Sequence, residues 1–357
     1  MRILQLIDSL EAGGAERMSV NFANELAERI DFSGLVCTRA EGPLQKTLSD
    51  KVAYFFMHKK KALDFKALFR LKSFVKKNKV EIIQAHSSSF FTAVLLKILM
   101  PKLKIFWHDH YGNRSNMPQF SRRVLQICSM FFTGILVVNG YLKLWAHKYL
   151  FCKNIMFLEN FVSEQKMLTG LCLPGENGKR IIQIANLKYP KNHVLSLEVA
   201  QIVSEKYTNW TFHFIGKDFK DAYSENLFKI IADSNLTSQV FFHFNTQIDD
   251  YVNQAEICIL TSESEGLPVS ILEYGKFSKA VVSTHVGQID AVIDNGVSGF
   301  LVPSGEAFIF AKKVIELIED ETLREQFGEN LFQKVKNNFT FDAVSDSYFN
   351  FIKSAEQ

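Results

Sequence analysis

Short runs of apolar, β-prone residues alternate with longer helical patterns along almost the whole chain, and this alternation constrains the fold more than any other feature. The runs include RILQLID (residues 2–8), EIIQAH (81–86) and GILVVN (134–139), followed by RIIQIAN (180–186), EICILTS (256–262) and AVVST (280–284). Apolar strands between helices are typical of parallel sheets that are covered by helices on both faces. The sequence therefore predicts an α/β protein.

The length of the chain predicts two doubly wound domains in tandem. Its 357 residues exceed one ordinary domain, and two domains of about 150 to 180 residues are expected. The polar stretch TGLCLPGENGK (169–179) contains glycines and a proline and is the predicted linker. We predict a first domain over residues 1–168, a second over residues 180–338, and a C-terminal helix over residues 339–357 that packs back on the first domain. In open α/β sheets ligands bind beyond the carboxyl ends of the strands, so a cleft between two facing domains is the expected site.

Charge is distributed unevenly between the two predicted domains. Residues 1–168 contain 25 Lys and Arg against 13 Asp and Glu, or +12, whereas residues 169–357 contain 16 against 25, or −9. This asymmetry indicates an anionic partner for the first half, although chance variation of surface charge is the alternative. No nucleic-acid-binding motif accompanies the basic residues, and aromatic residues are not interleaved as a stacking platform, so no nucleic acid is expected as a partner.

The compartment is predicted from features that the sequence lacks. The N-terminal MRILQLIDSLEAGG has no apolar run of the signal-peptide type, and no segment offers about 18 uninterrupted apolar residues for a transmembrane helix. The five cysteines are odd in number and scattered, without metal-ligand spacing or a disulfide framework. We expect a cytoplasmic protein with reduced thiols.

The stretch SESEGLPVSILEYGK (262–276) places two carboxylates around a predicted helix start. Pro268 suits the first turn of a helix, which leaves the amides of Val269 and Ser270 to bind an anion. Glu273 would lie about 7.5 Å further along the axis, within reach of a sugar hydroxyl attached to a bound phosphate. Glu265 would lie on the other side of that phosphate, as a nucleotide-sugar requires. The alternative is an exposed Glu265 and a Glu273 that pairs with a neighbouring lysine.

These motifs resemble the retaining glycosyltransferases of family 4, whose signature is two glutamates separated by seven residues. The resemblance also includes MRILQLIDSLEAGGAER (1–17), LENFV (158–162), IIQIANLKYPKNH (181–193) and AVVSTHVGQIDAVIDNGVSGFLVP (280–303). It implies the GT-B architecture, with two facing Rossmann-like domains and a cleft between them, the acceptor side first and the nucleotide-sugar side second. It also implies metal-independent sugar transfer from a UDP- or GDP-linked donor, with retention of configuration and no cofactor.

The resemblance also implies roles for residues of the second half. Glu273 matches the residue that binds the donor's ribose, and Glu265 matches the one beside the transferred sugar. Gly266 and Leu267 match the backbone that lines the diphosphate, and Lys191 matches the phosphate-binding lysine, a compact cation suited to pyrophosphate.

Two departures from the family pattern affect the donor contacts. The family's usual Arg is Asn186 here, so Lys188 becomes the candidate for the second positive charge. Gln288 and Ala291 replace the usual Gly and Glu after the Val-Gly pair, so the contacts to the sugar are expected to differ.

In the first half, Gly13 and Gly14 match the family's glycine loop near the donor diphosphate, where the lack of a side chain lets backbone approach a ligand. A plain strand-to-helix turn is the alternative. In FWHDHYGN (106–113), His108 matches the family's histidine near the donor sugar, ahead of His110. Without the resemblance, both histidines would be considered structural. Two histidines separated by one residue can bind a metal, but no third ligand is apparent, so no metal site is predicted.

The segment HKKKALDFKALFRLKSFVKKNK (58–79) combines apolar residues at helical spacing with many lysines. Such a basic amphipathic helix can lie on an anionic membrane surface, whereas a core-packing helix with a solvated lysine face is the alternative. Together with the +12 first half, it favours a glycan or phosphorylated, lipid-linked acceptor and peripheral contact with the inner face of the membrane.

The leading hypothesis is a retaining glycosyltransferase of surface polysaccharide biosynthesis. The rivals are a nucleotide-sugar epimerase or phosphorylase of the same fold, and a non-catalytic nucleotide-sugar-binding module. Asn186, Gln288 and Ala291 favour the module, whereas Glu265, Glu273, Lys191 and His108 argue for the enzyme.

Overall fold

The computed structural model describes residues 1–111, 114, 117–244 and 246–354. Positions 112–113, 115–116, 245 and 355–357 of the ranges discussed above lie outside the described residues. The chain forms two compact units, one of Met1–Ser163 with Phe341–Gln357 and one of Glu164–Thr340. Each unit is described here by itself.

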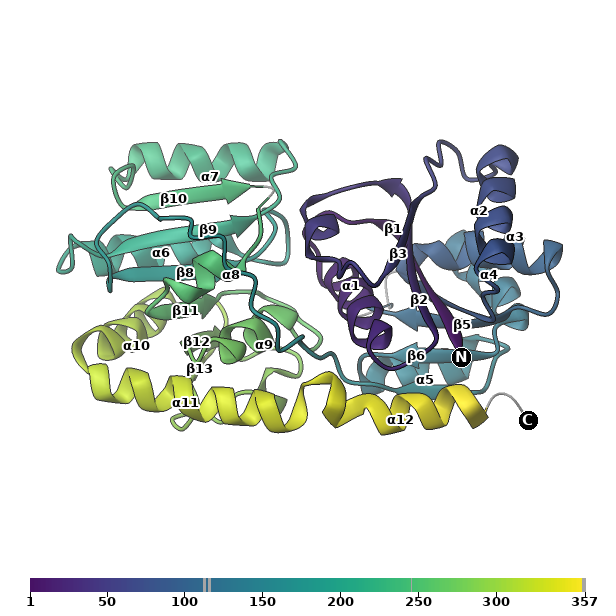
Figure 1. The fold of residues 1–357 in the computed structure, drawn as a ribbon. Coiled ribbons are helices and arrows are strands. Elements are labelled where there is room, and N and C mark those ends of the chain that lie inside the picture. Colours follow the sequence, from purple (N-terminus) through teal and green to yellow (C-terminus); the bar gives the residue numbers. More distant parts are fainter. Residues whose placement is uncertain (112–113, 115–116, 245, 355–357) are drawn as a thin grey trace. The chain divides into compact units, whose positions relative to one another are not determined.

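The first unit is built on a seven-stranded parallel sheet with the order β3-β2-β1-β4-β5-β6-β7 (Figure 1). Its strands are β1 (Arg2–Ser9), β2 (Phe32–Ala40), β3 (Ala53–Phe56), β4 (Ile82–His86), β5 (Lys104–Asp109), β6 (Gly134–Val137) and β7 (Ile155–Phe157). Its α-helices are α1 (Gly14–Ala27), α2 (Phe65–Lys77), α3 (Phe90–Leu99), α4 (Gln119–Cys128), α5 (Gly140–Tyr149) and α12 (Phe341–Ser354). Short 3-10 helices are η1 (Pro43–Thr47), η2 (Ser87–Ser89) and η3 (Ser129–Phe131).

Helices cover both faces of this sheet, as the alternation of side chains along β5 shows. Trp107 packs edge-on against Phe90 of α3, with ring centroids 5.9 Å apart. The next residue, His108, points to the opposite face and packs edge-on against Phe22 of α1 at 5.6 Å. Successive side chains of a strand point to opposite faces, so strands buried on both faces are apolar along their length.

The second unit repeats this plan with a six-stranded parallel sheet of order β10-β9-β8-β11-β12-β13. Its strands are β8 (Arg180–Ile184), β9 (Thr211–Gly216), β10 (Val240–Phe244), β11 (Ile257–Leu260), β12 (Ala280–Thr284) and β13 (Phe300–Val302). Its helices are α6 (His193–Ser204), α7 (Ala222–Asp233), α8 (Asp249–Asn253), α9 (Val269–Lys276), η4 (Ile289–Ala291), α10 (Ala307–Glu319) and α11 (Glu321–Asn338). The predicted α/β class with two doubly wound sheets is confirmed.

The strand order places a topological switch point in each sheet. In the first unit it lies between β1 and β4, and in the second between β8 and β11, because the chain runs outward in opposite directions from these pairs. Ligands of open α/β sheets bind beyond the carboxyl ends of the strands at such points. The loops that follow β8 and β11 are therefore the natural place for a site in the second unit.

The division between the units differs from the predicted linker. The structure divides the chain after Ser163, and residues 169–179 belong to the second unit. The segment that precedes β8 is fixed to α8 and its C-cap by hydrogen bonds: Thr169 N lies 3.0 Å from Asp250 Oδ1, and Leu173 N lies 3.2 Å from Oε1 of the C-cap residue Gln254. The Gly- and Pro-containing composition that suggested a free linker instead belongs to an anchored segment.

The C-terminal helix α12 belongs to the first unit. The Tyr348 hydroxyl donates to Gln84 Oε1 of β4 at 2.7 Å, and Arg29, which follows the end of α1, forms a 2.7 Å ion pair with Asp342. Phe351 packs edge-on against Phe106 of β5.

None of the helices among the described residues combines the length and the apolar character needed to cross a lipid bilayer.

Candidate active site

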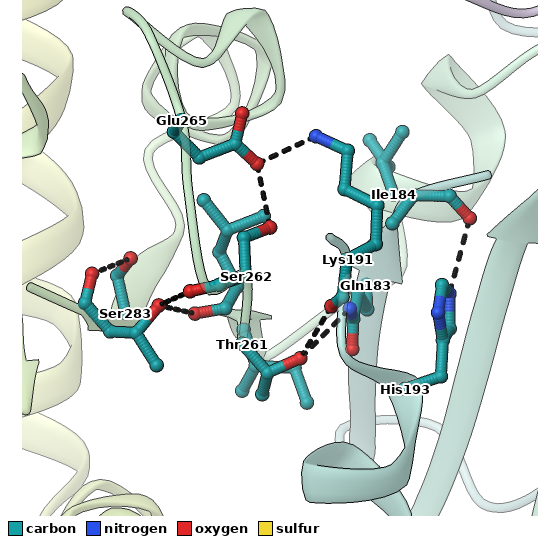
Figure 2. A network of polar contacts seen from close by, with 12 residues as sticks. Gln183, Ile184, Lys191, His193, Thr261, Ser262, Glu265 and Ser283 are labelled. Carbon is teal, nitrogen blue, oxygen red and sulfur yellow. Dashed lines mark hydrogen bonds and ion pairs between the residues drawn. The ribbon is translucent and has the colours of Figure 1, made fainter. Parts of the chain in front are cut away.

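The loops after β8 and β11 bring Lys191 and Glu265 together at the switch point of the second unit. Lys191 Nζ lies 2.6 Å from Glu265 Oε1, and the Ser262 hydroxyl donates to the same carboxylate oxygen at 2.6 Å. Figure 2 shows Glu265 between these two partners. The Glu265 side chain is 9% exposed and that of Lys191 is 23% exposed, so the ion pair reaches solvent through the lysine. Such a pair combines a cation for an anionic ligand with a carboxylate for sugar hydroxyls.

A buried polar network holds the two loops against each other. Thr261 Oγ1 lies 3.1 Å from the carbonyl oxygen of Lys191 and 3.0 Å from that of Asn192. It also accepts a hydrogen bond from Gln183 Nε2 of β8 at 3.1 Å (Figure 2). The amide of Glu263 donates to the Pro190 carbonyl at 2.8 Å. Because satisfied buried networks rigidify a structure, the backbone that carries Lys191 is fixed relative to Glu265.

Helix α9 begins directly after Pro268, one residue later than the sequence predicted. Pro268 precedes the helix with φ −73° and ψ 118°, and Val269 is the first helical residue. The Pro268 carbonyl accepts from Ile271 N at 3.2 Å, so the amides of Val269 and Ser270 lie at the start of the helix. Amides at a helix N-terminus favour an anion such as a diphosphate.

The turn at Gly287 packs closely against the backbone of the loop before α9. Gly287 has φ +65°, and a Cβ at this position would lie 2.1 Å from the Glu265 carbonyl oxygen. The next amide, of Gln288, donates to the Gly266 carbonyl at 3.2 Å. Only glycine combines this backbone conformation with such a close approach. The Val-Gly pair in the sequence thus has a structural reason, whatever residue follows it.

Glu273 lies inside α9 and is held by a lysine, as the alternative reading of the sequence proposed. Its side chain is 4% exposed, and Lys276 Nζ lies 3.7 Å from Glu273 Oε2. The other half of that alternative, an exposed Glu265, is wrong because Glu265 is largely buried against Lys191. Both glutamates are therefore paired with a cation.

The remaining donor-binding candidates occupy the same loops with different exposure. Lys188 is exposed, and its ammonium lies 5.6 Å from the Phe219 ring centroid. Leu267 is buried at 5% exposure, next to the half-buried Gly266. The substituted Asn186 accepts a hydrogen bond from the amide of Lys217 at 2.8 Å, which connects the loop after β8 to the loop after β9.

In the first unit, the two glycines lie at the start of α1. Gly13 precedes the helix in an extended conformation, with φ −163° and ψ 158°, and Gly14 is the first helical residue. A Cβ on Gly13 would meet the end of the flexible Glu16 side chain, with Oε2 at 2.1 Å. The glycines thus form a strand-to-helix turn that follows β1 at the switch point of the first sheet.

The structure adds a third imidazole, His86, to the two histidines of β5 and its end. The sequence showed no third potential metal ligand, and this expectation is corrected: ring nitrogens of His86, His108 and His110 lie within 4.8 Å of one another. His86 ends β4 and pairs with His108 in register. The predicted strand 81–86 already ended in histidine, but its pairing with β5 could not be read from the sequence.

Hydrogen bonds already occupy much of this histidine cluster. His86 Nε2 lies 2.7 Å from Gln5 Oε1, and its Nδ1 lies 2.8 Å from His110 Nε2. Gln84 Nε2 lies 3.1 Å from His108 Nδ1. If Gln5 accepts and Gln84 donates, His86 accepts from His110 and His108 carries its proton on Nε2. The arrangement is that of neutral imidazoles in a hydrogen-bond network.

Burial keeps the three imidazoles neutral at physiological pH. It lowers the pKa of His86 and of His108 well below the usual value, with His110 as a lesser cause in both, and lowers the pKa of His110 to about 3. His108 is only 1% exposed and packs under the His110 ring, whose centroid is 3.9 Å away. His110, at the carboxyl end of β5, is partly exposed. The partly exposed His110 therefore offers a neutral imidazole for a single hydrogen bond to a sugar.

Sequence reasoning did not anticipate Ser262, Thr261 and Gln183 as parts of the site. Ser262 stands three residues before Glu265, within the stretch that the sequence singled out, so its position was a usable signal. Thr261 and Gln183 act through contacts with a loop 70 or more residues away, which no local pattern reveals.

Comparison with known proteins agrees with this architecture. Residues 12–166 match the family model described as Glycosyltransferase Family 4, and residues 173–334 match Glycosyl transferases group 1. The GalNAc-alpha-(1->4)-GalNAc-alpha-(1->3)-diNAcBac-PP-undecaprenol alpha-1,4-N-acetyl-D-galactosaminyltransferase of Campylobacter jejuni is 23% identical over 99% of this chain and 98% of its own length.

Solved structures share the fold along the whole chain. The HepE protein of Anabaena, in complex with UDP and glucose, has a TM-score of 0.80 at 16% identity, covering 99% of this chain and 100% of that one. A glycosyltransferase from Rickettsia africae has a TM-score of 0.76 at 17% identity, covering 100% and 99% of the two chains. With the two family models matching one half each, the protein belongs to the group 1 glycosyltransferases, with a first half of the family 4 type and the GT-B class of fold.

Proposed function

We propose that this glycosyltransferase moves a sugar from a UDP-linked donor to a lipid-linked glycan acceptor, with retention of anomeric configuration and without a divalent metal. The observation that carries the proposal is the Lys191–Glu265 pair, 2.6 Å apart, at the switch point where α9 begins. The Anabaena structure with UDP and glucose supports the choice of nucleotide, and the undecaprenol-linked acceptor in the Campylobacter enzyme's name supports the acceptor class.

In this proposal, positive charge for the leaving diphosphate comes from the protein itself. Lys191 and the amides of Val269 and Ser270 bind the diphosphate, and the exposed Lys188 adds a second cation from the same loop as Lys191. Such preorganised donors and cations stabilise the charge that develops in the transition state. Glu273 binds the ribose, the backbone of Gly266 and Leu267 lines the diphosphate, and Glu265 faces the transferred sugar.

The proposed bond changes occur on one face of the sugar ring. The bond from the anomeric carbon to the diphosphate oxygen breaks, and the acceptor hydroxyl oxygen bonds to the same face of that carbon. The acceptor's proton passes to the leaving diphosphate oxygen. Lys191 stabilises the negative charge that develops on that oxygen as the bond breaks. Glu265 is held by Lys191 and Ser262, and we do not assign it as a nucleophile.

The first unit contributes the histidine and the glycine turn. We propose His108, whose tautomer is fixed by Gln84, as the family's histidine for the donor sugar, and the backbone at Gly13 and Gly14 as a diphosphate contact. Because His110 at the end of β5 is partly exposed, His110→Ala should be measured beside His108→Ala. The variant with the larger loss of transfer activity identifies the imidazole that contacts the substrate.

Screening UDP-sugars and GDP-sugars against the purified protein tests this proposal. We expect one UDP-sugar to raise the melting temperature and to give, with a diphosphate-lipid acceptor, a product one sugar heavier by mass spectrometry. NMR of the anomeric proton in that product should show retained configuration, and turnover should persist in EDTA. Selective stabilisation by a GDP-sugar would overturn the choice of UDP, and binding without any product would favour a non-catalytic module.

The surface of the first unit supports the lipid-linked acceptor. Residues 58–158 contain 18 Lys and Arg against 3 Asp and Glu, so the basic excess of the first half is concentrated from α2 to β7. Helix α2 packs through Leu68, Leu71 and Val75 into the core and leaves Phe65 and Phe69 exposed at 63% and 55%. The helix thus combines a core-packing face with exposed aromatic and lysine side chains.

Substituting both exposed phenylalanines of α2 should weaken membrane binding. Phe65→Ser with Phe69→Ser removes apolar side chains that insert at the lipid interface, and we expect roughly a tenfold or greater loss of binding to vesicles containing phosphatidylglycerol. Sedimentation with vesicles of known composition measures it. Phe308→Ser, which changes a 73% exposed phenylalanine of α10, is the matched control and should bind like wild type. Equal pelleting with neutral vesicles, independent of salt, would contradict the proposed electrostatic contact.

A further inference from the structure

Lys276, in the last turn of α9, is buried between two carboxylates. Lys276 is 7% exposed, Glu273 is 3% exposed and Asp249 is 5% exposed. Lys276 Nζ lies 3.2 Å from Asp249 Oδ2 and 3.7 Å from Glu273 Oε2. Lysine is rarely buried to this extent unless it is paired, so its position is dictated by these two partners.

We propose that Lys276 is a positioning residue for the donor site, because it orients the Glu273 carboxylate toward the hydroxyls of the nucleotide ribose. The inference rests on the proposed function, in which Glu273 binds that ribose. Lys276 and Glu273 are three residues apart on one helix face, so the cation approaches the carboxylate from the C-terminal side. The carboxylate is thereby restrained in a helix whose N-terminal amides lie in the direction of the diphosphate.

Asp249 holds the lysine in this place from a different part of the chain. Asp249 begins α8, and its Oδ2 also accepts a hydrogen bond from the amide of Met167 at 2.8 Å. The adjacent Asp250 accepts from the amides of Thr169 and Gly170 at 3.0 and 3.1 Å. Asp249 is thus fixed by backbone on one side and by Lys276 on the other, which gives the lysine a rigid second anchor.

The test compares two ligands that differ only in the ribose hydroxyls. Binding of UDP and of 2′,3′-dideoxy-UDP is measured by titration calorimetry on the full-length protein. Hydrogen bonds to a charged group contribute enough for wild type to prefer UDP by about tenfold or more. Glu273→Gln should remove most of this preference. Lys276→Met keeps the aliphatic bulk, and we expect it to reduce the preference at least about threefold while dideoxy-UDP binds as in wild type.

Lys279→Met is the matched control. Lys279 lies two residues beyond the α9 C-cap, Phe277, and its ammonium donates to the Asn253 carbonyl of α8, so this variant should keep the full preference for UDP. Should Lys276→Met fail to fold, Asp249→Asn replaces it, because the amide retains an acceptor for Met167 while the charge that anchors Lys276 is lost.

The possible outcomes separate this inference from the function on which it rests. A folded Lys276→Met or Asp249→Asn variant that still prefers UDP as strongly as wild type, while Glu273→Gln does not, overturns the positioning role alone. Failure of wild type to bind UDP, or an undiminished preference in Glu273→Gln, overturns the assignment of Glu273 to the ribose. The inference is supported if Glu273→Gln and the folded Lys276→Met or Asp249→Asn variant both lose preference for UDP over dideoxy-UDP, while dideoxy-UDP still binds as in wild type.

Discussion

Lys191→Ala is expected to lower kcat/KM for the UDP-sugar by about two to three orders of magnitude, the usual effect of removing a group that stabilises developing charge. In the structure Lys191 Nζ is 2.6 Å from Glu265, and its side chain reaches solvent beside the start of α9. Its loss removes the cation from the leaving diphosphate, so kcat should fall together with kcat/KM. Initial rates over a range of donor concentrations, with product quantified by mass spectrometry, measure both constants.

Two further variants identify the cause of that loss. Lys191→Ala also leaves the Glu265 carboxylate without its cation, and a carboxylate that has lost its partner is costly when largely buried. The double variant Lys191→Ala with Glu265→Gln removes this penalty, so recovery of activity in the double variant would show that the unpaired carboxylate, and not the lost cation, causes the slow turnover. Lys229→Ala, which changes an exposed lysine of α7, serves as the control. Near-normal turnover of Lys191→Ala would refute the assignment.

Glu273→Ala is expected to reduce kcat/KM for the donor by about two orders of magnitude or more, since hydrogen bonds to a charged group contribute about 1.5–3 kcal/mol each. The ribose is bound similarly in the ground state and the transition state, so most of the loss should appear as a raised KM. The substitution also removes one of the two carboxylates that pair with Lys276 and leaves Asp249, whose Oδ2 lies 3.2 Å from Lys276 Nζ. Steady-state kinetics with varied donor, together with calorimetric binding of UDP, measure the effect.

The control for this variant lies in the same segment. Glu263→Ala alters an exposed carboxylate two residues before Glu265. The backbone amide of Glu263, rather than its side chain, connects the two loops, so the substitution leaves that hydrogen bond in place. It should leave donor KM within about twofold of wild type, as surface substitutions usually do. If Glu273→Ala raises KM no more than Glu263→Ala does, Glu273 does not bind the donor.

Sequence patterns predicted the two sheets because strand and helix periodicities are local. Strands such as RILQLID and EICILTS are continuous apolar runs, and they form β1 and β11 within a few residues of the predicted bounds. The stretch after EICILTS also carried enough local information to place Glu265 in a loop and Glu273 in a helix. The linker was misplaced because composition does not reveal that residues 167–173 bind to α8.

Contacts between distant segments were beyond local patterns. The Lys191–Glu265 pair spans 74 residues and depends on β8 and β11 being neighbours, which strand order alone decides. The i,i+3 spacing of Glu273 and Lys276 was visible in the sequence, but the third member, Asp249, comes from α8. For the same reason the sequence did not show that His86 joins the two histidines of β5 and its end, because its contact with His108 follows from the register of β4 and β5.

The return of α12 to the first unit has a consequence for how such enzymes diversify. Because Phe341–Gln357 belongs with Met1–Ser163, the half expected to recognise the acceptor is encoded in two separate stretches of the gene. A recombination event that exchanges this half between relatives must therefore have two crossover points, or the incoming half receives a foreign helix against Gln84 and Phe106. Chimeras that graft one enzyme's acceptor specificity onto another should be cut at both junctions.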